Sequence, residues 1–255
     1  MRPRLRPGTH LLRRADGTVQ VGLDPARAVR LPGSPTVLAT LDRLRLGAEP
    51  LADDTATLAL LERHALLATG SEPPCAVLLP VLRGFGHPTR ALLVDELSRH
   101  LRVQRPGRSK TRSVGVLAGV GEPDRALVDD WTRAGVPHLV LRLTEGHAVL
   151  GPFVEPARTA CLRCVDAHLT DADSSWPLLV HQYAVASSRD RPDGSGEPVD
   201  QLLATLAAAW AARDLASYAA GRRPATWSAT VRIEAELTAI ESRGWLRHPE
   251  CGCSR

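Results

Sequence analysis

The sequence is poor in aromatic side chains and in lysine, and it has no long apolar run. Only nine of its 255 residues are Phe, Trp or Tyr, and its single lysine, Lys110, accompanies 31 arginines. The longest nearly apolar run, residues 203–212, is ten residues long, whereas a helix that crosses a bilayer needs about 20. The first ten residues are positively charged but lack the apolar stretch of a signal peptide. We therefore expect a soluble, cytoplasmic protein with no membrane partner.

The charge of the chain gives little support for nucleic-acid binding. The formal net charge of +4 arises from 32 basic and 28 acidic residues that are spread along the sequence. Nucleic-acid-binding domains concentrate their basic residues on one face, and the sequence contains no arginine cluster interleaved with aromatics. We expect no nucleic-acid partner, although a mildly basic surface suits an acidic peptide.

Length and composition predict a folded protein with more than one unit. The apolar share of 44% and the charged share of 24% are ordinary for globular chains. A chain of this length suits one large domain or two unequal ones. The Ser-Glu-Pro-Pro segment at residues 71–74 is typical of a boundary. We expect a small domain over residues 1–71 and a larger one over residues 75–255.

The first domain has the pattern of an α+β winged helix-turn-helix. The pattern predicts three strands followed by two helices, over residues 10–14, 18–23, 28–31, 35–46 and 54–68. Asp16-Gly17 favours a tight hairpin between the first two strands because both residue types tolerate positive φ. Pro35 after Ser34 is typical of a helix start, and Gly47 can end that helix.

The second domain has the pattern of a Rossmann-like α/β fold. Strands are predicted over residues 75–82, 114–120, 136–143, 148–150 and 227–237, and helices over residues 89–101, 123–134 and 199–220. The alternation of strands and helices indicates a parallel sheet with right-handed crossovers.

The cysteines carry the strongest chemical signal. Cys161 and Cys164 form a C-x-x-C pair, and Cys251 and Cys253 form a C-x-C pair after 86 intervening residues. In a cytosolic chain such pairs indicate metal ligands, and four thiolates complete a tetrahedral shell, so we expect a structural zinc. That zinc knuckle would fasten the C-terminal segment to the sheet. Unligated thiols or a disulfide remain the alternative, and His248 is a possible substitute ligand.

A glycine turn is the second candidate site. Gly84 and Gly86 follow a predicted strand and Thr89 opens a helix, a pattern typical of nucleotide phosphate loops. The third glycine of that motif is missing, and Pro88 removes a backbone N–H that would face a phosphate. We expect no nucleotide-binding residue here. The scattered histidines suggest no triad, so we expect no catalytic residue either.

Several short motifs of the larger domain resemble those of one family. They are Gly151-Pro152-Phe153-Val154, Thr159-Ala160-Cys161-Leu162-Arg163-Cys164, Trp176-Pro177 and His248-Pro249-x-Cys251-x-Cys253. In order and spacing they resemble the ThiF-like cyclodehydratase-partner proteins of azoline-forming pathways, which bind precursor leader peptides. The resemblance covers residues 75–255. The smaller domain resembles, in pattern and position, the PqqD-like recognition element of these proteins.

The resemblance implies a non-catalytic role. Members of this family bind the leader of a ribosomally made precursor peptide and present its core to a YcaO-type cyclodehydratase, which uses ATP to convert Cys, Ser or Thr into azolines. It also implies a possible homodimer. Two alternatives stay open: an ATP-dependent ThiF-type adenylyltransferase, which would carry an intact glycine loop, and a zinc-containing winged-helix regulator.

The resemblance also points to a place for the leader. That place lies between the third predicted strand and the helix over residues 54–68, and an extended peptide would add there as a further strand. The expected peptide-binding residues are Ala28, Val29, Arg30, Leu31, Arg63 and Leu67. Arg30 would meet an acidic leader side chain. In the alternative, Val29 and Leu31 pack inward while Arg30 is solvated.

Overall fold

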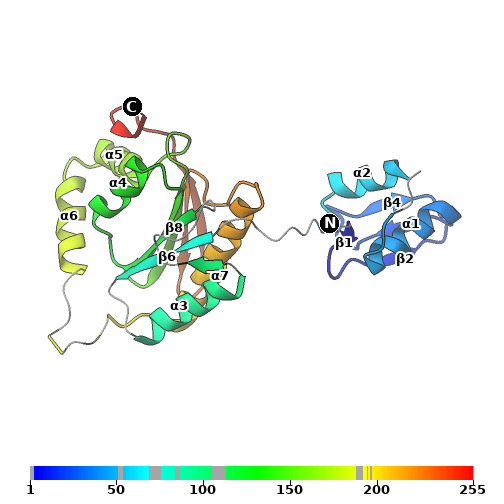
Figure 1. Cartoon of the computed structure of the whole chain (residues 1–255), viewed down its shortest axis with the longest axis horizontal. Helices are drawn as coiled ribbons and strands as arrows, with labels where there is room; N and C mark the ends of the chain where they lie inside the picture. Colours follow the sequence, from blue (N-terminus) through cyan, green and yellow to red (C-terminus); the bar gives the residue numbers. More distant parts are fainter. Residues whose placement is uncertain are drawn as a thin grey trace. The chain divides into compact units, whose positions relative to one another are not determined.

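The computed structural model describes residues 3–50, 54–68, 76–83, 87–100, 102–104, 113–187, 192–193, 195 and 197–254. The chain divides into two compact units, Met1–Glu72 and Pro73–Arg255 (Figure 1). Among the described residues, no helix is both long and apolar enough to cross a membrane.

The first unit combines a three-stranded antiparallel sheet with two helices. Its elements are β1 (Arg4–Leu5), β2 (Leu11–Arg13), β3 (Val19–Val21), β4 (Val29–Leu31), α1 (Pro35–Leu46), α2 (Thr55–Arg63) and β5 (Leu67–Ala68). The sheet order is β2-β3-β4, and β1 pairs separately with β5. The three predicted strands are confirmed as β2, β3 and β4, and the first predicted helix as α1, whereas β1 and β5 were not predicted. The winged-helix assignment stays a prediction.

Local sequence accounts for most of these elements. The carboxylate of Asp16 accepts hydrogen bonds from the backbone N–H and the hydroxyl of Thr18, and Gly17 takes a φ of 79° in the hairpin turn. Alternation in β3 buries Val19 and Val21. Gly47 ends α1 in the left-handed region and donates its N–H to carbonyls of the last turn.

The helix predicted over residues 54–68 is wrong in its second half. α2 ends at Arg63, and Ala65 has a φ of 54°. The Leu66 N–H then bonds to the Leu61 carbonyl, Leu66 is buried, and Leu67–Ala68 pairs with β1. Helical spacing of apolar residues cannot report a pairing with a strand more than 60 positions earlier. Leu67 therefore lies on a strand and not on the helix.

The second unit is built on a seven-stranded mixed sheet. Its strands are β6 (Ala76–Arg83), β7 (Arg102–Gln104), β8 (Ser113–Val120), β9 (His138–Thr144), β10 (His147–Val154), β11 (Ala229–Glu234) and β12 (Ile240–Gly244). The order is β12-β11-β10-β9-β8-β6-β7. Pairs among β7, β6, β8 and β9 are parallel, and the others are antiparallel.

The expected parallel sheet is thus only half right, although the Rossmann-like class is confirmed. Glu145 and Gly146 both adopt positive φ in a two-residue turn after β9. Such a turn returns the chain antiparallel to the strand it leaves. β10 therefore pairs antiparallel with β9. β11 and β12 continue the sheet antiparallel, although helices lie between β10 and β11 in the sequence.

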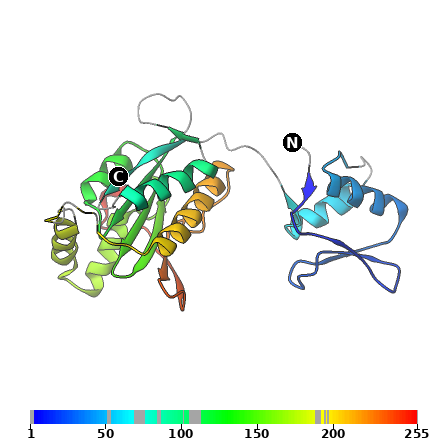
Figure 2. The same ribbon diagram turned by 90° about the horizontal axis from the view of Figure 1, so that it is seen from below.

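Helices cover both faces of this sheet (Figures 1 and 2). They are α3 (His87–His100), α4 (Arg125–Arg133), α5 (Leu162–Ala172), α6 (Trp176–Ser187) and α7 (Gln201–Ala219), followed near the end by a short 3-10 helix, Gly252–Ser254. α3 and α7 pack on one face against alternate strand residues such as Leu139 and Leu141. α4 and α5 pack on the other face against Leu117 and Val140. α6 lies beside α5.

Gly115 on β8 permits the close approach of α4. A Cβ added at this position would lie 2.9 Å from Cζ3 of Trp131, which is closer than packed carbon atoms tolerate. We expect Gly115→Ala to lower the free energy of unfolding by about 1–3 kcal/mol, the usual cost of overpacking a core. Denaturant titration of both proteins measures the difference. A variant as stable as the parent would contradict this packing.

Candidate functional site

The four paired cysteines come together at one end of α5. Cys161 is the N-cap of α5 and Cys164 lies in its first turn. Cys251 and Cys253 reach them on the segment that follows β12. The Sγ–Sγ distances are 3.8 Å for Cys161–Cys164, 3.6 Å for Cys161–Cys251 and 3.5 Å for Cys164–Cys253. The four sulfurs lie within 4.8 Å of one another and could hold a metal ion.

These distances fit a tetrahedral thiolate site. A Zn–S bond of about 2.3 Å places neighbouring sulfurs of a tetrahedron roughly 3.8 Å apart. Cys161 and Cys164 are buried, and Cys251 and Cys253 are partly buried, so four protein ligands would leave no coordination position for water. The donor set therefore suits a structural metal.

Neighbouring thiols and burial shift the pKa values of the cysteines. A hydrogen bond from Cys161 lowers the pKa of Cys164 to about 4, and the same bond raises the pKa of Cys161. Burial raises the pKa of Cys251 to about 11. At neutral pH the cluster therefore holds both thiols and thiolate, and a metal that binds all four as thiolates must displace protons.

His248 positions the last cysteines. Its carbonyl accepts the Cys251 N–H, and its backbone N–H donates to the Cys164 sulfur. Its ring Nε2 lies 3.0 Å from Asp171 on α5. His168, one turn earlier on α5, bonds through Nε2 to the carbonyl of Leu246. These contacts fasten the segment before the cysteines to α5.

A second group of side chains that could bind a metal lies nearby and consists of His168, Asp171 and His248. The hydrogen bonds of His248 do not leave a ring nitrogen free to bind a metal. The Glu250 N–H donates to Nδ1 of His248. In a neutral imidazole the other nitrogen, Nε2, then carries the proton, and it points at the Asp171 carboxylate. His248 is therefore a hydrogen-bonding residue beside the cysteines and not a replacement ligand.

A buried charge network lies next to the cysteines. Arg125 makes a bidentate pair with Asp166 and a further bond to Glu122, and Glu122 also accepts from Arg142. Burial opposes ionisation of Glu122, but the charges of Arg142 and Arg125 outweigh it and hold the pKa of this carboxyl below its usual value. The Trp176 indole N–H donates to Asp166.

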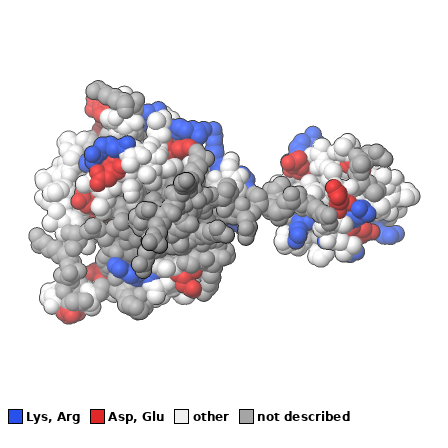
Figure 3. Space-filling view, viewed as in Figure 1, with Lys and Arg blue, Asp and Glu red and all other residues white. Residues whose placement is uncertain are grey.

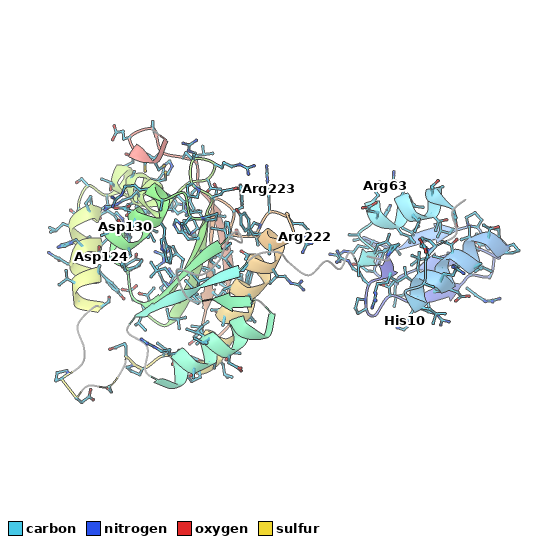
Figure 4. The ribbon with its side chains drawn as sticks, in the orientation of Figure 1. His10, Arg63, Asp124, Asp130, Arg222 and Arg223 are labelled. Atoms are coloured by element: carbon cyan, nitrogen blue, oxygen red, sulfur yellow. The ribbon has the colours of Figure 1, made fainter. Side chains whose placement is uncertain are left out.

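A cleft of about 670 Å³ opens beside this network, between α4, α5, α6 and the cysteine segment. Its lining includes Asp124, Arg125, Asp166, His181 and Cys251. Asp124 caps α4, and Asp130 lies on the same helix (Figure 4). Sequence reasoning missed Arg125, Asp166 and their partners, because the pair is 41 positions apart and no local motif marks it.

The predicted glycine turn is only partly described. Gly84 and Gly86 lie outside the described residues, and Thr89 is buried on α3, where its hydroxyl accepts a bond from Gln201. Ligands of doubly wound sheets bind outside the carboxyl ends of the parallel strands. At the carboxyl end of β9, α6 contacts the sheet, because the hydroxyls of Tyr183 on α6 and Thr144 on β9 lie 2.6 Å apart. That no nucleotide binds here stays a prediction.

In the first unit, β4 is an edge strand, and the hydrogen-bond pattern of the sheet identifies which of its backbone groups face the unpaired edge. The Arg14 N–H bonds to Thr18 O and the Gly22 N–H to His10 O. Bonding alternates along an antiparallel strand, so Val19 and Val21 of β3 direct their backbone groups toward β4. There they face Leu31 and Val29. The N–H and C=O of Arg30 consequently point to the open edge, with which no described strand pairs.

The predicted peptide-binding residues divide into three groups. Val29 and Leu31 are buried in the core, so their side chains face inward. Arg30 is exposed and Ala28 is partly buried. Arg63 is exposed at the end of α2 (Figure 4), which packs beside β4, whereas Leu67 lies on β5. On the face shown in Figure 3, acidic and basic side chains are interspersed on both units.

Comparison with known proteins finds the same fold in several solved structures. The sequence matches no protein-family model and no curated protein. Solved structures that it resembles include the heterocyclase TruD, at 15% identity and a TM-score of 0.69, covering 99% of this chain and 42% of TruD. A heterocyclase in complex with substrate and cofactor matches at 16% identity and a TM-score of 0.68, covering 99% of this chain and 39% of that one.

MccB of E. coli has the same fold over its full length. Its complex with MccA matches at 13% identity and a TM-score of 0.57 and covers 100% of both chains. MccB has also been crystallised with ATP. This chain spans about two fifths of the length of the two heterocyclases.

The expectation of a non-catalytic protein is wrong in the light of these neighbours. The heterocyclases are enzymes, and MccB was crystallised with ATP.

Zinc analysis tests the cysteine cluster. We expect about one zinc per chain in protein purified without chelators, because the sulfur distances fit four thiolate ligands. Cys251→Ser should lose the metal and melt at a lower temperature. Asp171→Ala, which removes only the partner of His248, should keep the metal but bind it more weakly. Elemental analysis that finds no metal in the parent protein would refute the assignment.

Proposed function

We propose that this chain is the precursor-binding component of a heterocyclase that modifies a ribosomally made peptide. The observation that carries the proposal is the open edge of β4, which directs the backbone N–H and C=O of Arg30 outward. The likeness of the whole chain to two heterocyclases supports it. The proposal assigns residues 1–71 to peptide recognition and residues 75–255 to a ThiF-like domain.

The leader would bind as an added strand. An extended peptide beside β4 exchanges main-chain hydrogen bonds with Arg30, which supply affinity, and side-chain pockets supply specificity. The exposed guanidinium groups of Arg30 and Arg63 favour acidic leader side chains. Leu67 is not part of this surface, because it lies on β5. The core of the precursor would then reach a YcaO-type partner that forms azolines.

The cysteine cluster would support this role structurally. When bound, zinc would crosslink α5 to the segment after β12 through Cys161, Cys164, Cys251 and Cys253. The chain's own hydrogen bonds already bring these segments together, because His248 contacts both Asp171 and the Cys164 sulfur. The zinc would therefore stabilise the ThiF-like domain, while peptide recognition resides in the other unit.

An ATP-dependent adenylating enzyme is the second candidate. The full-length match to MccB, which has been crystallised with ATP, favours it. The two candidates differ in which protein consumes ATP. In the first, azoline formation requires both this chain and a YcaO-type enzyme. In the second, this chain activates its substrate with ATP by itself.

Two proline variants test the leader site. Arg30→Pro deletes the outward N–H of β4. Arg13→Pro is the matched control, because Arg13 is also exposed and its N–H points outward from β2, the opposite edge of the same sheet. Loss of one hydrogen bond should weaken leader binding roughly threefold to tenfold in Arg30→Pro. Arg13→Pro should bind like the parent, as fluorescence polarisation with a labelled leader would measure.

Arg30→Ala separates the backbone from the charge. It keeps the N–H and removes the guanidinium, so a smaller loss of affinity than in Arg30→Pro is expected. Equal affinity of parent and Arg30→Pro, with both folded, would place the leader elsewhere.

A reconstituted reaction tests the assignment to a heterocyclase. We expect the precursor to lose one water per azoline only when this chain, the YcaO-type enzyme and ATP are all present. Mass spectrometry of the precursor follows the reaction. Pyrophosphate exchange by this chain alone would instead favour the adenylating enzyme.

A further inference from the structure

Three exposed arginines lie where β10 ends and β11 begins, and two of them pack on Trp227. The Cζ atom of Arg158 lies 5.6 Å from the centroid of the indole ring, and that of Arg223 lies 5.9 Å from it. Arg222 and Arg223 follow the carboxyl end of α7 (Figure 4). All three arginines are exposed. We call Arg158, Arg222, Arg223 and Trp227 the arginine surface.

Aromatic neighbours fix the indole of Trp227. The ring of Phe153 is stacked on it, with centroids 6.0 Å apart and an interplanar angle of 13°. The ring of Tyr218 on α7 lies 6.5 Å from the indole and 4.7 Å from Phe153. Phe153 and Tyr218 are buried, whereas Trp227 is only partly buried. The indole is therefore the outer ring of a core cluster and offers a fixed base to the two guanidinium groups.

Hydrogen bonds to a buried carboxylate fix the segment between α7 and β11. Asp214 of α7 is 1% exposed, and it accepts bonds from the backbone N–H groups of Ala225 and Thr226 and from the Thr226 hydroxyl. The Ala160 N–H donates to the Ser228 hydroxyl over 2.9 Å, which joins this segment to the one that follows β10. Groups held in place in this way lose little conformational entropy when they bind a ligand.

The charges of the three arginines are not balanced by carboxylates on the surface. Glu155 is only 8% exposed, and its carboxylate accepts bonds from Arg158 and from the Tyr218 hydroxyl. No carboxylate among the described residues pairs with Arg222 or Arg223. The helix dipole favours cations at the carboxyl end of α7, but it does not account for Arg158, which comes from the segment after β10. Uncompensated positive charge on a surface attracts anions.

We propose that the arginine surface binds a carboxylate-rich peptide segment. A guanidinium group can bind a carboxylate through two parallel N–H···O bonds, and arginine clusters are a recurring means of recognising acidic peptide motifs. Each guanidinium carries five N–H donors, so Arg158 keeps donors for a ligand beside its bond to Glu155. The surface belongs to the larger unit, whereas the proposed leader site belongs to the smaller one. The inference therefore does not depend on the proposed function.

The arrangement favours a peptide over a nucleic acid. Proteins that bind single strands combine a basic groove with aromatic rings on which successive bases stack. Here two arginines lie over the exposed side of the aromatic cluster, and acidic and basic side chains are interspersed on the face shown in Figure 3. Three guanidinium groups at one place suit a short acidic segment instead.

A labelled peptide of alternating Glu and Pro tests this surface in the full chain. Proline has no backbone N–H, so this peptide is a poor added strand for β4. We expect fluorescence polarisation to show binding at low salt that weakens as salt is added, because the charges are exposed. Arg222→Glu and Arg223→Glu should each weaken binding roughly threefold to tenfold, since each replaces an attractive charge with a repulsive one.

Arg133→Glu is the matched control. Arg133 is also an exposed arginine at the carboxyl end of a helix, α4, and this variant should bind the peptide like the parent. Circular dichroism selects a temperature at which all the proteins are folded.

Four outcomes would overturn the proposal. In the first, the parent does not bind the peptide. In the second, Arg222→Glu and Arg223→Glu both bind it as tightly as the parent. In the third, Arg133→Glu weakens binding as much as they do, which would show attraction to net charge alone. In the fourth, a labelled oligouridine of equal charge binds the parent more tightly than the peptide does, which would assign the surface to nucleic acid.

Discussion

The arrangement of the second unit depends on the buried guanidinium of Arg125. This side chain joins α4 to α5 through Asp166 and to the chain after β8 through Glu122, which in turn holds Arg142 of β9. Burying these charges is tolerable only because each has a partner; removing one partner of a buried pair typically costs about 3–5 kcal/mol. The network fixes α5, and α5 carries both Cys161 and Cys164. The geometry of the cysteine cluster is therefore set partly by charged side chains that are not themselves ligands of the cluster.

Features encoded by neighbouring residues could be predicted, and features made by distant contacts could not. The hairpin at Asp16-Gly17 and the end of α1 at Gly47 follow from backbone preferences of a few residues. The pairing of β1 with β5 depends on segments more than 60 positions apart, so the prediction extended α2 too far. The same limit hid the contact between Arg125 and Asp166, which no spacing rule connects.

The candidate sites show the same division. The cysteine spacing predicted a cluster, and the sulfurs do meet, because closely spaced pairs of thiols are typical of metal ligands. The family resemblance pointed to a leader site beside the third predicted strand, which is β4, but the residue whose N–H faces outward could be identified only from the hydrogen-bond pattern of β2 and β3. That the solved structures of this fold include enzymes could not be predicted, because a glycine turn that departs from a motif does not report which reactions proteins of the same fold catalyse.

The distance in sequence between the two cysteine pairs delays assembly of the cluster during translation. During translation Cys164 leaves the ribosome 87 residues before Cys251, and at about 5–20 residues per second that interval lasts roughly 4–17 s. α7, β11 and β12 are all synthesised within it. For those seconds the α5 thiols have no sulfur partners from the second pair, and an oxidant would find them at their most accessible. The maturation of this cluster is therefore governed by the order of synthesis as well as by affinity for a metal.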